Sequence, residues 1–112
     1  VVNQPQCVSI AREALTKAMG PEILYDAPHW MASESMGITL ELFPGIMAFT
    51  GIQDPQVGSG APHHTPQFDI GEKGLVAGLA SVLSYTQAML EKKPDLTFTP
   101  ASLKDVTEGV KK

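Results

Sequence analysis

The stretch that decides the predicted fold is Gly45-Ile46-Met47-Ala48-Phe49-Thr50-Gly51, a short apolar run enclosed by glycines. A continuous apolar run of this length between turn signals is typical of a strand that is buried on both faces. Such strands occur mainly in parallel sheets whose two faces are covered by helices. We therefore predict an α/β fold with a mostly parallel sheet flanked by helices.

The residues before this run predict two helices and a short strand. Residues 5–19 start at Pro5, repeat apolar residues at three- and four-residue spacing, and stop at Gly20. Residues 22–25 are β-capable and predict a strand. A second helix is expected to end at Leu42, with a serine as its cap.

The residues after the run predict a long helix and a polar tail. Asp69 and Glu72 are spaced like a capping pair, and the apolar pattern that follows predicts a helix to about Glu91. Several glycines and alanines in this helix suggest close packing on a sheet. Residues 92–112 are polar, with a short amphipathic helix expected within residues 100–110.

Composition narrows the possible functions. The 112 residues are enough for one domain, and the net charge of −4 comes without a Lys/Arg cluster, which argues against nucleic acid and anionic membranes as partners. A single cysteine, Cys7, fits a reducing compartment, so we expect a cytoplasmic protein. Because the chain starts at Val1 without a Met, we also expect a piece of a longer polypeptide.

Residues 61–70 carry the strongest chemical signal. His63 and His64 lie between Pro62 and Pro66, and proline fixes the backbone and removes N–H donors. A stiff loop suits a metal ligand, because an imidazole binds well when its position is already settled.

Three further blocks resemble one enzyme family. They are Val2-Asn3, Met31-Ala32-Ser33-Glu34-Ser35-Met36 and Pro44 to Gly51, and His64-Thr65-Pro66-Gln67-Phe68-Asp69 follows them. In this order they resemble the C-terminal part of the metal-dependent aminoacylases and amidohydrolases, which include hippurate hydrolases, auxin-conjugate hydrolases, N-acetyl-diaminopimelate deacetylases and carboxypeptidase G. The resemblance covers residues 1–91.

The resemblance implies a zinc-peptidase-like catalytic domain, of which this chain would be the C-terminal portion. Residues 1–4 would end a strand or hinge of the lid domain, residues 5–91 would belong to the catalytic domain, and residues 92–112 would form the tail. The missing N-terminal segment of the catalytic domain would be the main partner, and a homodimer is usual in the family.

The resemblance also implies a two-metal hydrolase of N-acyl amino acids or related amide conjugates. His64 would be its last metal ligand, with zinc or manganese as the two ions. No catalytic residue lies in this segment by that comparison, so we expect the chain alone to be inactive and without bound metal, since a catalytic metal needs three or four protein ligands.

Three more residues are candidates for substrate or outer-shell contacts: Glu34, Ser33 and His63. Each has a structural alternative. Glu34 equally suits a helix N-terminus, where the dipole favours a carboxylate, and Ser33 equally suits a cap. His63 occupies a variable place in the family, and the pattern favours an exposed neighbour of the site over a substrate contact.

The family pattern has Gly and Asp where this sequence has Ala32 and Ser35. These departures keep two other functions open. One is a non-catalytic α/β binding or assembly module built on the same scaffold. The other is a small independent domain in which the two histidines are incidental.

Overall fold

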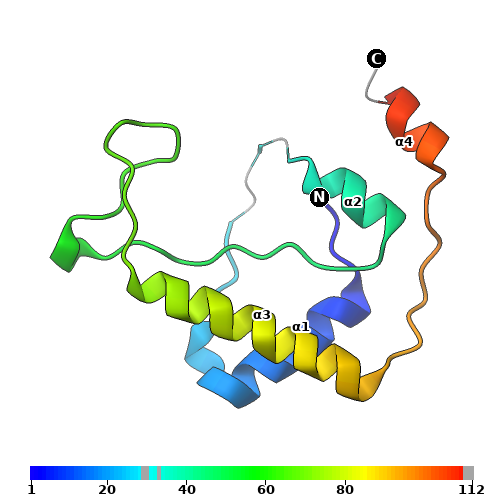
Figure 1. Ribbon diagram of the computed structural model, residues 1–112, viewed down its shortest axis with the longest axis horizontal. Coiled ribbons are helices and arrows are strands. Elements are labelled where there is room, and N and C mark those ends of the chain that lie inside the picture. The colour runs from blue at the N-terminus through cyan, green and yellow to red at the C-terminus, as the bar shows by residue number, and fades with distance from the viewer. Residues whose placement is uncertain (29–30, 33, 110–112) are drawn as a thin grey trace.

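The computed structural model describes residues 1–28, 31–32 and 34–109, and the elements within them are all helical (Figure 1). In chain order they are α1 (Pro5–Met19), η1 (Pro21–Ile23), α2 (Met36–Leu42), η2 (Pro55–Val57), α3 (Lys73–Lys92) and α4 (Leu103–Gly109), where η marks a 3₁₀ turn. The predicted helices at residues 5–19, up to Leu42 and up to about Glu91 are confirmed, and α4 lies inside the range expected for the tail helix.

Helix α1 has the end signals that its sequence indicates. Gln4 caps it, because the side-chain oxygen accepts a hydrogen bond from the Cys7 N–H at 2.9 Å, and Pro5 occupies the first turn. Gly20 ends the helix at φ 92°, where a residue with a Cβ would be strained, and its N–H donates to the Thr16 carbonyl.

Helices α1 and α3 pack side by side and form the main contact of the fold (Figure 1). Cys7 is fully buried in α1, together with Ile10 and Ala11. The Tyr85 phenol on α3 forms a hydrogen bond with the Cys7 thiol. The pKa of Tyr85 is raised, mainly because the phenol is partly buried and also because of this hydrogen bond. Lys92 and Glu13 join the two helices at the surface with a 2.6 Å ion pair.

Helix α3 turns its small residues inward. A Cβ on Gly74 would lie 2.8 Å from the Gly51 carbonyl oxygen, and one on Gly78 would lie 3.3 Å from the Thr50 hydroxyl. The helix therefore approaches the backbone of residues 50–52 as closely as glycine permits. Its large apolar side chains point the other way, into solvent.

Gly74→Val is expected to push residues 50–52 away from α3, because the new side chain would meet a backbone carbonyl that cannot rotate aside. Overpacking of this kind costs about 1–3 kcal/mol. The free energy of unfolding, measured in urea, tests this. Gly51→Ala is the control, since a Cβ there meets nothing within 4 Å. Equal stability of the two variants would show that the close approach is unimportant.

The tail is fastened to the rest of the molecule. Thr97 donates its N–H to the Gln6 side chain at 2.8 Å, and Ala101 donates to the Glu41 carbonyl at 2.8 Å. Helix α4 then packs on α2, and Val106 and Leu40 are both buried. These contacts hold residues 95–106 along α1 and α2.

The prediction of an α/β fold is wrong, because no strand or sheet occurs among the described residues. Residues 22–25, predicted as a strand, begin with the 3₁₀ turn η1. Residues 45–51, predicted as a parallel strand, run as an extended segment over α3, and no strand pairs with them in the described ranges 1–28, 31–32 and 34–109 (Figure 1). An apolar run can predict an extended backbone, but a sheet needs a second strand to pair with it.

The molecule is flat and open. It measures 47 × 39 × 20 Å, with a radius of gyration of 16.3 Å, whereas a compact chain of this length has a radius of gyration of about 13 Å. Among the residues that the structure describes, few apolar side chains are buried: Cys7, Ile10, Ala11, Leu40 and Val106. Much apolar surface therefore remains in contact with water.

Candidate functional site

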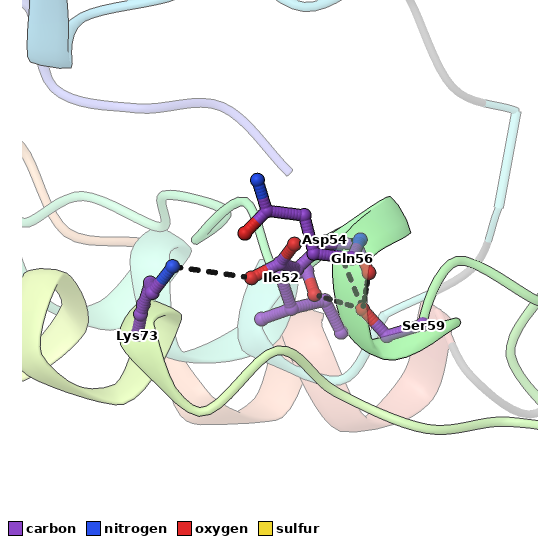
Figure 2. Close-up of polar contacts among 5 residues, drawn as sticks. All are labelled: Ile52, Asp54, Gln56, Ser59 and Lys73. Carbon is purple, nitrogen blue, oxygen red and sulfur yellow. Dashed lines mark hydrogen bonds and ion pairs between the residues drawn. The ribbon is translucent and has the colours of Figure 1, made fainter.

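A hydrogen-bonded polar cluster lies where the long loop leaves the extended segment (Figure 2). Ser59 is its centre, with only 5% of its surface exposed. Its hydroxyl accepts a hydrogen bond from the Asp54 N–H at 2.7 Å and lies 3.1 Å from the Ile52 carbonyl, to which it donates. One side chain thus closes the turn formed by residues 52–59.

Asp54 connects this turn to α3. One carboxylate oxygen caps η2 by accepting from the Gln56 N–H at 3.0 Å, and the other lies 3.6 Å from Lys73 Nζ at the start of α3 (Figure 2). Lys73 is 84% exposed, and ion pairs at exposed positions contribute about 0–1 kcal/mol. The ion pair therefore adds little to the stability of the loop.

A shallow hollow lies between residues 51–54 and the first turns of α3. Its volume is about 240 Å³, and Gly71, Gly74 and Ala77 line it beside Asp54 and Lys73. Sites for small molecules usually have volumes of roughly 300–1,000 Å³. This hollow is thus too small and too open to be assigned a substrate.

Ser59→Ala is expected to loosen the turn, because it leaves the Asp54 N–H without its hydrogen bond in a half-buried place. An unpaired buried donor costs about 1–3 kcal/mol. Hydrogen exchange at the Asp54 amide should become about 10- to 100-fold faster. The control is Ser9→Ala on the exposed side of α1; an unchanged Asp54 amide in Ser59→Ala would contradict the assignment.

The two loop histidines are exposed and lie on a tight turn. His64 has a φ of 62°, the left-handed conformation, and the Thr65 hydroxyl donates to the Pro62 carbonyl at 2.8 Å. The His63 ring lies 5.1 Å from the Phe68 ring and 6.4 Å from the His64 ring, measured between centroids. The turn thus presents both imidazoles at the surface.

The part of the chain that the structure describes contains no group of three His, Cys, Asp or Glu side chains placed to hold a metal ion. Two adjacent imidazoles are an incomplete donor set for a catalytic metal. The assignment of His64 as a ligand, completed by residues from another segment, therefore stays a prediction.

Glu34 lies at the start of α2 and is exposed. Its carboxylate accepts hydrogen bonds from the Met36 N–H at 3.2 Å and the Ser35 hydroxyl at 3.1 Å. These contacts, with the Met36 N–H as the larger cause, lower the pKa of Glu34. Figure 1 shows the start of α2 well apart from the loop that holds His64. The structure does not bring these two candidates together, and Ser33 lies outside the described residues.

Asp69 does not cap α3, contrary to prediction. The helix starts at Lys73, and the Asp69 carboxylate instead accepts from the N–H of its neighbour Ile70 at 2.8 Å. Sequence reasoning also missed Asp54 and Ser59 as the organising residues of the loop. The signals were present, since Asp before Pro55 and Ser between two glycines are both turn patterns.

No protein-family model and no solved structure matches this chain. One curated relative is a protein of Rhodococcus jostii (strain RHA1) with the name "Putative glutamate–cysteine ligase 2-3". It is 31% identical over 87 residues, which are 78% of this chain and 11% of the relative. The chain thus spans about a ninth of the length of the relative that it matches.

This comparison corrects the predicted enzyme class. The resemblance to amidohydrolases is wrong by this finding, because the relative carries the name of a ligase, a different reaction class. The predicted hydrolase activity and the metallopeptidase assignment rested on that resemblance and are therefore also wrong. The helical structure, whose described residues contain no group placed to hold a metal ion, is consistent with this correction. The described residues also contain no helix with the length and apolar character needed to span a membrane.

Proposed function

We propose that this chain is a docking segment that packs against a larger protein body. The observation that carries the proposal is the exposed surface of 8851 Å². A free-standing folded protein of 12.0 kDa exposes about 6,000 Å². The chain therefore exposes about 2,900 Å² more than a self-contained protein of its mass.

Part of the exposed surface is an apolar face of α3. Six large side chains on this helix are each more than half exposed: Leu75, Val76, Leu79, Val82, Leu83 and Leu90. They recur at three- and four-residue spacing, so they form one face, which we call the α3 outer face. A contiguous apolar face of this kind marks an interaction site.

The area supports a larger body as the partner in preference to a second copy of the chain. A standard interface buries about 800 Å² per partner, so the excess is more than three times that value. A symmetric dimer that covered it would bury nearly 6,000 Å² in total, above the usual range even for permanent dimers. The relative supports the same view, because its matching segment belongs to a polypeptide about nine times longer.

Dye binding tests the docking proposal. The chain alone is expected to bind an apolar dye such as ANS, and its α3 outer face should lose the dye in the assembly isolated through a tag on this chain. A free chain that is monomeric, binds no dye and unfolds cooperatively would overturn the proposal.

For the assembly we propose the reaction that the relative's name gives, the joining of glutamate to cysteine. The comparison over 78% of this chain supports this choice. The test is to incubate the purified assembly with both amino acids and a nucleoside triphosphate, and to follow the dipeptide by mass spectrometry. Absence of dipeptide from an assembly that is otherwise intact would overturn this assignment but not the docking role.

The proposed location is the cytoplasm. Cys7 is a free thiol that is fully buried against α3, and free thiols are kept reduced in that compartment.

A further inference from the structure

We infer that residues 46–50 bind a β-strand of the docking body by main-chain hydrogen bonds; this inference rests on the proposed docking function. The sheet that they join belongs to the partner, since the described part of this chain forms none. The argument starts from the two edges of this extended segment.

One edge is already occupied. The Gly45 carbonyl accepts from the Gln4 N–H at 3.0 Å. The Asn3 side chain then imitates a strand at Met47: it accepts from the Met47 N–H at 2.8 Å and donates to the Met47 carbonyl at 2.9 Å. Positions 45 and 47 therefore direct their main-chain groups to the same neighbour, the N-terminal residues.

The other edge is open. In an extended chain, alternate residues direct their main-chain groups to opposite sides, so residues 46, 48 and 50 face away from Asn3. Within the described residues, the main-chain N–H and C=O groups of Ile46, Ala48 and Thr50 make no hydrogen bond. This edge offers three donors and three acceptors at two-residue spacing.

Docking makes the open edge costly unless it is paired. Phe43 lies just before the segment and Phe49 lies within it; their side chains are 64% and 62% exposed, and Ala48 and Thr50 are also exposed. A body that covers these apolar rings also removes water from the main chain between them. Buried main-chain groups in folded proteins are almost always paired. An extended strand supplies matching groups at the same spacing, which a helix does not.

The segment is also well supported from below. Gly74 and Gly78 of α3 lie directly against residues 50–52, so the helix supports the C-terminal end of the segment. A strand held in place before binding loses less conformational freedom when it binds. The geometry thus suits addition of a partner strand.

The experiment compares Ala48→Pro with Ala48→Ser. Proline removes the N–H on the open edge, whereas serine keeps it. We expect Ala48→Pro to weaken assembly about 10-fold or more and Ala48→Ser to change it less than about twofold. In wild-type assembly, the amides of Ile46, Ala48 and Thr50 should exchange at least about 100-fold more slowly than in the free chain.

Two controls keep the outcomes separate. Cys7 should remain unreactive to a thiol reagent in Ala48→Pro, because it reports α1–α3 packing; if that packing is lost, N-methyl-alanine at position 48 replaces proline. If Leu79→Glu prevents assembly while Ala48→Pro does not, strand addition is wrong and docking stands. If neither variant weakens assembly, the docking proposal itself is wrong. A purified assembly that contains only copies of this chain would contradict the proposal that the partner is a larger protein.

Discussion

Leu79→Glu is expected to abolish docking while leaving the free chain folded. Leu79 is central in the α3 outer face and is 62% exposed in the free chain, so the substitution removes no packing there. In the assembly it would lose about 2 kcal/mol of apolar burial and would place an unpaired carboxylate at a dry contact, which costs several kcal/mol more. Affinity should therefore fall at least about 100-fold, as measured by fluorescence anisotropy of the labelled chain.

Ser9→Glu is the matched control. It adds the same charge to an exposed position, but on α1 and not on the α3 outer face. Thermal unfolding of both free variants should stay close to that of the wild type. Undiminished affinity of Leu79→Glu would show that the α3 outer face stays in water in the assembly.

The sequence predicts the helices well because their signals are local. Pro5 and Gly20 bracket α1, and periodic apolar residues mark α3, so each helix is specified by residues that are near one another in the chain. The apolar run 45–51 specifies only an extended backbone. Whether it becomes a strand depends on a neighbour that no local pattern can provide.

Periodicity alone leaves the orientation of α3 open, although its glycines and alanines predict close packing of the small residues. Its pattern has two faces, one of large apolar residues and one of small residues, and the usual expectation is that the large ones form the core. The close approach at Gly74 and the contact of Tyr85 with Cys7 show that the face with small residues packs inward. The predicted metal site at His64 could not be tested from local sequence for a similar reason. Adjacent histidines predict a turn, but the other side chains that would bind the metal lie in distant segments, whose arrangement no local pattern predicts.

Ile10→Ala is expected to unfold the free chain, because the packing of α1 on α3 depends on a very small core. Ile10 is 9% exposed and is among the few buried apolar side chains. Truncation of a buried isoleucine to alanine costs about 2–5 kcal/mol, and small domains have little more than that in total. We therefore expect the variant to lose its cooperative unfolding transition by circular dichroism at 25 °C.

Ile23→Ala is the control for this effect, because it makes the same chemical change at a residue that is 38% exposed. It should cost less than about 1 kcal/mol, since little buried volume is lost. In the assembly, Ile10→Ala should regain helix content, because binding to the folded state adds free energy to folding. If Ile10→Ala and Ile23→Ala unfold alike, the α1–α3 contact is not what holds the free chain together.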